Sequence, residues 1–164
     1  MNSTSTIGEV RPEHDRASGS DLVLLHFTRA FALPILELWS YLTDQPLLAT
    51  WFGTMVGDPF GGKVEITTND DCCNETIHVT VDSCTSPHEL DVTIDGAVLE
   101  LKLHQIGVVT TLELVRRHLH PDDVAASGMR WQFYLDRLET TIAQVPLPRW
   151  ADYAALAVEY HSPE

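Results

Sequence analysis

Hydrophobic and polar positions follow two periodicities along the chain, one typical of helices and one typical of strands. Between residues 33 and 53, apolar residues recur at the spacing of a helix with one apolar face. That face consists of Ile35, Leu38, Trp39 and Leu42. Pro46 suits the first turn of a second short helix, where its missing N–H group costs nothing. Segments of alternating character predict strands at residues 22–32, 54–56, 63–68, 74–83, 88–94, 97–105 and 108–118.

A longer helical pattern follows these strands. It begins at Pro121 and ends near Val145, before two further prolines. Its expected buried stripe is Trp131, Leu135, Leu138 and Ile142. We therefore predict an α+β protein with a helix-grip fold. An antiparallel sheet curves around the long C-terminal helix, and two short helices follow the first strand.

The predicted domain spans residues 21–146. Residues 1–20 are polar and without period, so we expect a disordered N-terminal tail. Residues 147–164 form a C-terminal extension in which a short helix is expected.

Turn residues set the expected strand register. Asp95 and Gly96 predict a type I′ hairpin, because both central positions of that turn have positive φ. The pairs it implies are Val92 with Leu99 and Leu90 with Leu101. A turn at Ile106 and Gly107 implies Leu101 with Leu112 and Leu99 with Leu114. A loop over residues 84–87 implies Val81 with Leu90 and Val79 with Val92. All three turns place the same apolar side chains on one face of the sheet.

This inner face predicts a cavity under the closing helix. Its apolar lining would be Val79, Val92, Leu99, Leu101, Leu112, Leu114, Trp131 and Leu135. Glu75 and Arg116 lie on the same face at one end, where they form either a structural ion pair or an anchor for a ligand's polar group. Arg130 is expected to point outward.

Composition narrows the class of protein. The chain has 164 residues, with 10 basic and 24 acidic side chains and a net charge of −14. This charge argues against nucleic-acid binding and favours a basic protein partner. Formation of a homodimer is the alternative. No apolar run approaches the roughly twenty residues that span a bilayer, so membrane insertion is not expected. The N-terminus lacks the pattern of a signal peptide, and we expect a cytoplasmic protein.

Metal and cofactor chemistry finds little support. The three cysteines, two of them adjacent at Cys72 and Cys73, have no zinc spacing and are expected to be ordinary thiols. The histidines His118 and His120 beside two aspartates fit a solvated loop better than a metal site. Phosphate-loop, nucleophile-elbow and HExxH motifs are absent from the sequence. We expect neither a metal nor another cofactor.

Three stretches of the chain resemble a known superfamily. They are Phe31–Asp44 with Trp51 and Phe52, then Phe60–Val64, and lastly Trp131, Leu135 and Leu138. Together they are similar to the START/SRPBCC superfamily, and within it to proteins like the activator of the ninety-kilodalton heat-shock protein ATPase. That family has glycine directly before the tryptophan of the closing helix, whereas this chain has Arg130. The resemblance covers about residues 22–145 and implies that Trp51 and Trp131 lie near the mouth of the cavity.

Three functions remain open at this point. The favoured one is non-enzymatic binding of a small hydrophobic or amphipathic ligand. The second is a co-chaperone-like or other protein-interaction domain with a filled cavity, linked to the stress response by the resemblance. We do not expect a true chaperone role, because the 164 residues leave no room for the additional chaperone-binding domain of the eukaryotic co-chaperones. The third is a cyclase- or hydrolase-type enzyme, which needs acid and base groups that converge inside the cavity. The candidates Glu75, Arg116, His118 and His88 lie at opposite ends instead.

Overall fold

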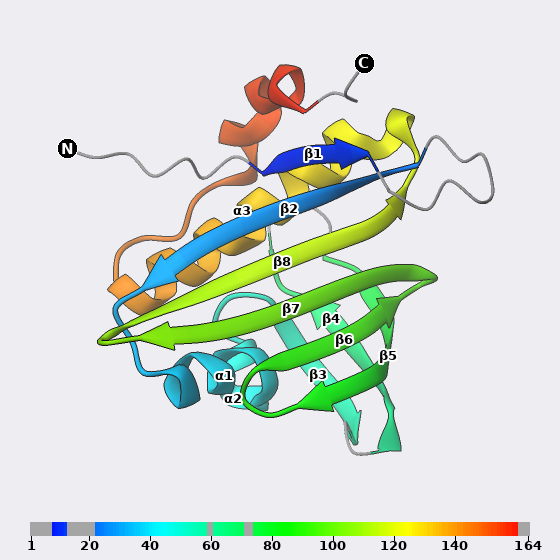
Figure 1. Ribbon diagram of the computed structural model, residues 1–164. Coiled ribbons are helices and arrows are strands. Elements are labelled where there is room, and N and C mark those ends of the chain that lie inside the picture. The colour runs from blue at the N-terminus through cyan, green and yellow to red at the C-terminus, as the bar shows by residue number, and fades with distance from the viewer. Residues whose placement is uncertain (1–7, 13–21, 59–60, 71–73, 161–164) are drawn as a thin grey trace.

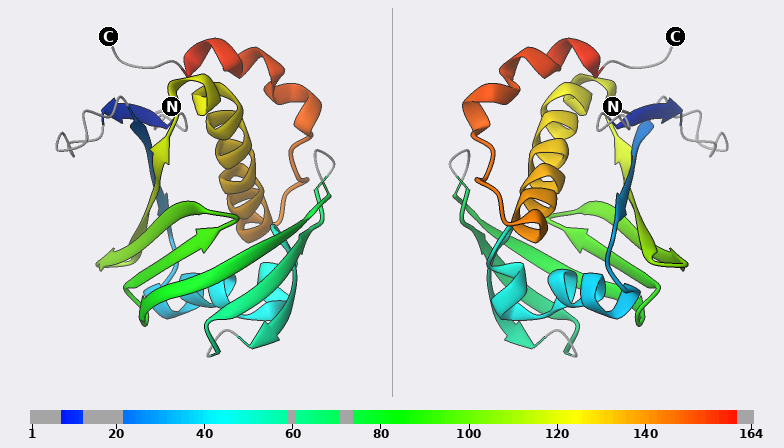
Figure 2. Two further views of the ribbon diagram at one scale, coloured as in Figure 1. Left: turned by 90° about the vertical axis from the view of Figure 1, so that its right-hand side faces the viewer. Right: turned by 90° about the vertical axis from the view of Figure 1, so that its left-hand side faces the viewer.

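The computed structural model describes residues 8–12, 22–58, 61–70 and 74–160. Within these residues the chain forms an eight-stranded antiparallel sheet that curves around one long helix (Figures 1 and 2). The strands are β1 (Glu9–Pro12), β2 (Val23–Phe31), β3 (Gly53–Asp58), β4 (Lys63–Thr68), β5 (Thr76–Thr85), β6 (Glu89–Ile94), β7 (Ala97–Ile106) and β8 (Val109–Leu119). The sheet order is β1-β2-β8-β7-β6-β5-β4-β3.

The helices occupy the concave side and one end of the sheet. They are α1 (Ile35–Thr43), α2 (Gln45–Leu48), α3 (Val124–Ala143) and the 3₁₀ helices η2 (Pro121–Asp123) and η3 (Trp150–Glu159). Figure 2 shows α3 lying across the concave face and α1 and α2 covering the end of the curved sheet. The predicted α+β helix-grip fold is therefore confirmed, including the two short helices after the long strand β2. None of the helices in the described part of the chain is long and apolar enough to span a membrane.

The N-terminal segment differs from the prediction of a disordered tail. Residues 9–12 form strand β1, which pairs with β2 at the edge of the sheet. The polar composition hid this strand, because its stability comes from long-range pairing rather than from an apolar pattern. Residues 1–7 and 13–20 of the predicted tail lie outside the described residues, as do Phe60, Cys72 and Cys73.

The first predicted hairpin is confirmed. Asp95 and Gly96 have φ values of 47° and 87°, as a type I′ turn requires. The register pairs Val92 with Leu99 and Leu90 with Leu101, as the turn residues imply.

The second hairpin was predicted with a register wrong by two residues. Leu101 pairs with Leu114, and Leu99 pairs with Arg116, because the strands turn at Gly107 and Val108. Gly107 has a φ of 60°, which suits the first central position of a type II′ turn. The predicted turn would have forced Ile106, a β-branched residue, into positive φ. Since the error is an even number of residues, the apolar side chains stay on the inner face.

The hairpin between β5 and β6 also differs from the prediction. Val81 pairs with Val92 and Val79 with Ile94, and the register shifts between Val81 and Ser83. This β-bulge reverses the inward and outward alternation in the last part of β5. As a result Cys84, rather than Ser83, pairs with Leu90 on the inner side.

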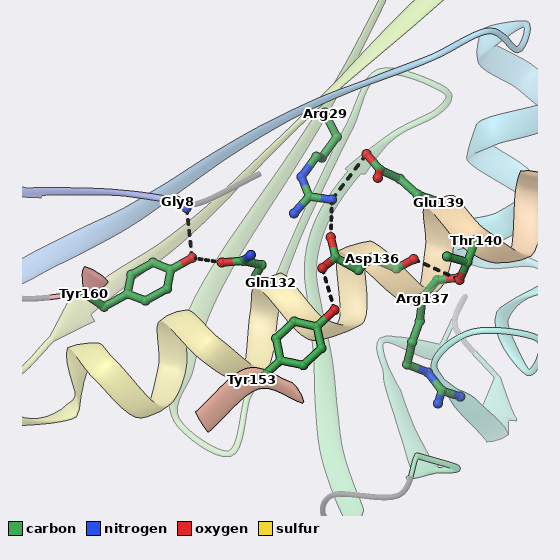
Figure 3. A network of polar contacts seen from close by, with 9 residues as sticks. All are labelled: Gly8, Arg29, Gln132, Asp136, Arg137, Glu139, Thr140, Tyr153 and Tyr160. Atoms are coloured by element: carbon green, nitrogen blue, oxygen red, sulfur yellow. Dashed lines mark hydrogen bonds and ion pairs between the residues drawn. The ribbon is translucent and has the colours of Figure 1, made fainter. Parts of the chain in front are cut away.

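A polar network fixes the side of α3 that faces away from the cavity (Figure 3). Arg29 of β2 is 2% exposed and forms ion pairs with Asp136 at 2.8 Å and Glu139 at 3.2 Å. The Tyr153 hydroxyl of η3 donates to the other oxygen of Asp136 at 2.5 Å. The network therefore ties α3 to the sheet and to the C-terminal extension at once.

The two terminal segments meet on the same side of the molecule. The Tyr160 hydroxyl accepts a hydrogen bond from the Gly8 N–H at 2.9 Å and donates to Gln132 Oε1 at 2.6 Å (Figure 3). The Tyr160 ring covers Gly128, where an added Cβ would lie 2.4 Å from the ring. Only glycine permits this close approach of a ring to the helix backbone.

Candidate functional site

A cavity of about 420 Å³ lies between the inner face of the sheet, α1–α2 and α3. Its volume falls in the range of about 300–1,000 Å³ that is common for small-molecule sites. Elements far apart in the sequence supply the walls. Strands β4 to β8 form one side, α1, α2 and β3 form another, and Trp131 and Leu135 of α3 close the cavity.

All the apolar contacts predicted from the sequence lie on this wall. They are Trp51, Val79, Val92, Leu99, Leu101, Leu112, Leu114, Trp131 and Leu135. That they bind a ligand stays a prediction. In the predicted stripe of α3, Leu135 and Leu138 are buried, whereas Trp131 and Ile142 are only partly buried.

Further wall residues come from elements whose pairing the turns did not fix. They are Trp39, Leu42, Leu48, Phe52, Met55, Val64 and Ile66. The sequence carries a signal for them, because Val64 and Ile66 alternate with polar residues in β4, and Trp39 and Leu42 lie on the apolar face of α1. Their convergence on the cavity follows from the curvature of the sheet.

The exposed part of the lining marks where the cavity opens. Asp44, Cys84 and Ser86 are exposed wall residues from the α1–α2 connection and from the β5–β6 hairpin. Figure 1 shows this hairpin turn beside α1 and α2. The bulge in β5 is the reason that Cys84 faces the opening.

A second, polar pocket of about 280 Å³ adjoins the apolar cavity. The predicted end residues Glu75 and Arg116 both line this pocket rather than the cavity itself. Glu75 is ion-paired with Arg130, so the inner-face pair of Glu75 and Arg116 anticipated from the sequence does not form.

Arg130 was wrongly predicted to point outward. Its guanidinium contacts Glu75 and the Tyr134 hydroxyl, and it lines the polar pocket. Burial opposes its charge, but the hydrogen bonds to Glu75 and Tyr134 outweigh burial and raise the pKa of Arg130. This charged side chain stands where the resemblance noted in the sequence implies glycine, and the pocket is therefore not purely apolar.

Tyr134 links this pocket to the loop after β4. It is 2% exposed and donates a hydrogen bond to Asp70 Oδ2 at 2.8 Å. Burial, together with the hydrogen bond to Asp70, raises the pKa of Tyr134 from 10.0 to about 12.

This shift predicts a stability change at high pH. The folded protein holds the Tyr134 proton more tightly than the unfolded chain, so the contribution is complete below pH 10 and is lost as pH rises to about 12. We expect Tyr134→Phe to reduce this alkaline loss of stability. Urea unfolding followed between neutral pH and pH 12 checks it, and identical pH profiles for the two proteins would contradict it.

Arg137 holds the cavity wall from behind. It is 5% exposed, and its Nε donates to the Trp51 carbonyl at 2.8 Å. Its Nη2 donates to Asn69 Oδ1, also at 2.8 Å. These two bonds fix the backbone at Trp51 against α3 and thereby set one wall of the cavity.

The described residues include no group of three or more His, Cys, Asp or Glu side chains that would hold a metal ion. The acidic residues of the outer face are spread along the strands, with Asp91 opposite Glu100. Glu100 pairs with Arg117 at 2.9 Å and Asp91 accepts from Ser83, so neighbouring groups satisfy this face.

A curved antiparallel sheet that grips one long helix over a cavity defines a helix-grip protein of the START/SRPBCC type. The family model described as "Activator of Hsp90 ATPase homolog 1-like protein" matches residues 32–143, and the chain belongs to this family. A search of curated proteins found no match.

Solved structures share the fold at low sequence identity. CalU16 from Micromonospora echinospora is 21% identical, with a TM-score of 0.72 over 93% of this chain and 92% of that one. EF2215 from Enterococcus faecalis, a conserved protein of unknown function, is 17% identical, with a TM-score of 0.68 over 93% and 88%. BPP1335 from Bordetella parapertussis is 17% identical, with a TM-score of 0.68 over 99% and 100%.

Proposed function

We propose that this protein binds a small apolar molecule in the cavity between the sheet and α3 without transforming it. The observation that carries the proposal is the cavity itself, about 420 Å³ in volume and walled mostly by buried aliphatic and aromatic side chains. Apolar walls that converge in this way favour an apolar ligand through the hydrophobic effect.

The polar residues of the lining favour binding over catalysis. Among the described residues that line the cavity, the one carboxylate is Asp44, at the opening. Glu75 lies in the second pocket and is ion-paired with Arg130. A cyclase or hydrolase needs an acid and a base close to the reacting atoms, and the cavity interior does not offer such a pair.

Filling the cavity tests the proposal. We expect wild type to bind N-phenyl-1-naphthylamine, a neutral probe whose fluorescence rises in apolar surroundings. Val92→Trp places a large side chain in the cavity and should weaken this binding by at least about tenfold, or 1.4 kcal/mol. Fluorescence titration measures the affinity, and circular dichroism checks the fold.

A matched control comes from the neighbouring strand. Val98 precedes the cavity residue Leu99, so its side chain points to the other face of the sheet, and Val98→Trp should leave probe binding unchanged. Equal affinities for wild type and Val92→Trp, with both proteins folded, would refute binding in the cavity.

The second candidate function is a protein-interaction domain. Asp91 and Glu100 face each other across β6 and β7, which places like charges side by side on the outer face and suits a basic partner. Their bonds to Ser83 and Arg117 already offset much of this repulsion, so the cavity carries more weight. If folded wild type does not bind the probe, the result would favour a protein-interaction domain over a ligand-binding domain.

A further inference from the structure

The polar pocket and the apolar cavity share part of their walls but differ in chemistry. Phe52, Ile94, Leu99 and Trp131 line both spaces. Beyond them the second pocket adds two arginines, two carboxylates and three hydroxyl groups. These are Arg116, Arg130, Glu75, Asp95, Thr68, Ser127 and Tyr134. The apolar cavity and the polar pocket therefore adjoin, and the four shared side chains border both spaces.

The charges of this pocket are not equally balanced. Arg130 is ion-paired with Glu75, and Asp95 accepts a hydrogen bond from the backbone N–H of His78 at 3.3 Å. Arg116 donates a hydrogen bond to the carbonyl of Arg117, but it makes no ion pair with any described residue. Of the two arginines in the pocket, Arg116 is the one that no carboxylate of the described residues pairs with.

Partial burial makes this isolated charge costly. Burial lowers the pKa of Arg116, and the more distant Asp123 offsets only part of this effect. An anion that enters the pocket would replace the lost hydration and would receive charge-assisted hydrogen bonds, which are about twice as strong as neutral ones.

The register brings Arg116 to the edge of the apolar cavity. Arg116 of β8 pairs directly with Leu99 of β7, and Leu99 belongs to both walls. A molecule whose apolar part lies against Leu99 and Trp131 therefore brings its other end within reach of the guanidinium.

We propose that the ligand is an amphipathic anion whose apolar body fills the cavity and whose carboxylate, or similar acidic group, is held by Arg116 in the second pocket. This inference rests on the proposed function of the cavity and adds the chemical class of its ligand. The ion-paired Glu75 and Arg130 form another part of the lining of this pocket, in which the two charges balance each other.

Two ligands that differ only in charge test the inference. Decanoic acid and decanamide have the same apolar chain, and each is titrated against bound N-phenyl-1-naphthylamine at pH 8. Wild type should prefer the acid. Arg116→Met should lower the affinity for decanoic acid by about 10- to 100-fold and leave the affinity for decanamide nearly unchanged.

The neighbouring arginine provides the control. Arg117 pairs with Glu100 on the outer face, so Arg117→Met should leave both ligands unaffected. Glu75→Gln is an independent arm that does not depend on the folding of the Arg116 variant, because the Glu75 side chain is 46% exposed. It removes one of the two negative charges that line the pocket, which repel a bound carboxylate, and should strengthen the binding of decanoic acid by about 3- to 10-fold.

The outcomes separate this inference from the proposed function. If the probe and both ligands fail to bind folded wild type, the cavity function and the inference fall together. If both ligands displace the probe but the acid has no advantage, the anion site is refuted while the cavity function stands. Equal losses for both ligands in Arg116→Met, or weaker acid binding in Glu75→Gln, also overturn it.

Discussion

Replacing Asp136 by alanine should lower the free energy of unfolding by about 3–5 kcal/mol, as expected when one partner of a buried ion pair is removed. Its carboxylate holds Arg29 at 2.8 Å with one oxygen and the Tyr153 hydroxyl at 2.5 Å with the other. Arg29 is 2% exposed, so the loss leaves a buried charge with a weaker counterion. Urea unfolding followed by circular dichroism measures the effect.

Glu139 supplies the control for this expectation. It also pairs with Arg29, but at 3.2 Å and with a side chain that is 37% exposed. Its replacement by alanine should cost about 0–1 kcal/mol, because solvent screens the more exposed Glu139 carboxylate and Arg29 keeps its pair with Asp136. Similar small losses for both variants would mean that the network around Arg29 does not hold α3 in place.

Leu138→Ala should cost more than Leu101→Ala, although both remove the same atoms from the core. Leu138 is fully buried and lies on neither pocket wall, so its removal opens a new void, and we expect a loss of about 3–5 kcal/mol. Leu101 already borders the cavity and has neighbours on fewer sides, so its loss should lie near 2 kcal/mol.

Denaturation of both variants under one set of conditions checks this order. The Leu101→Ala result also bears on the state of the cavity. A cost equal to that of Leu138→Ala would indicate that the wall is packed as tightly as the rest of the core, contrary to an open binding space.

Local signals in the sequence predict the faces of the sheet well and the registers less well. Asp95 and Gly96 specify their turn through backbone preference, so the pairing of β6 with β7 follows from two residues. Gly107 allowed two turns, and the alternation of side chains fits both, because they differ by two residues. The bulge after Val81 has no local signature and arises from pairing with β6.

The same reasoning explains which site residues were found. The apolar wall followed from alternation in strands β5 to β8 and from the spacing on α3. Arg130 was missed because it precedes Trp131 by one position, away from the centre of the apolar stripe, and its partner Glu75 is 55 residues away in the sequence. In β2, Arg29 alternates with Phe27 and Phe31 on the inner face. This pattern indicates a buried charge, which needs a partner. The orientation of α3 that places Asp136 beside Arg29 cannot be predicted from the local sequence.

The two sides of α3 are subject to different mutational constraints. Trp131 and Leu135 face the cavity, whereas Gln132 and Asp136 bond to the terminal segments and to β2 on the other side (Figure 3). Substitutions at the first two positions reshape the space offered to a ligand while the anchoring contacts persist. The helix can therefore accumulate variation in specificity along one side at little cost to its placement, which makes Trp131 and Leu135 the natural positions for redesigning the binding preference of this scaffold.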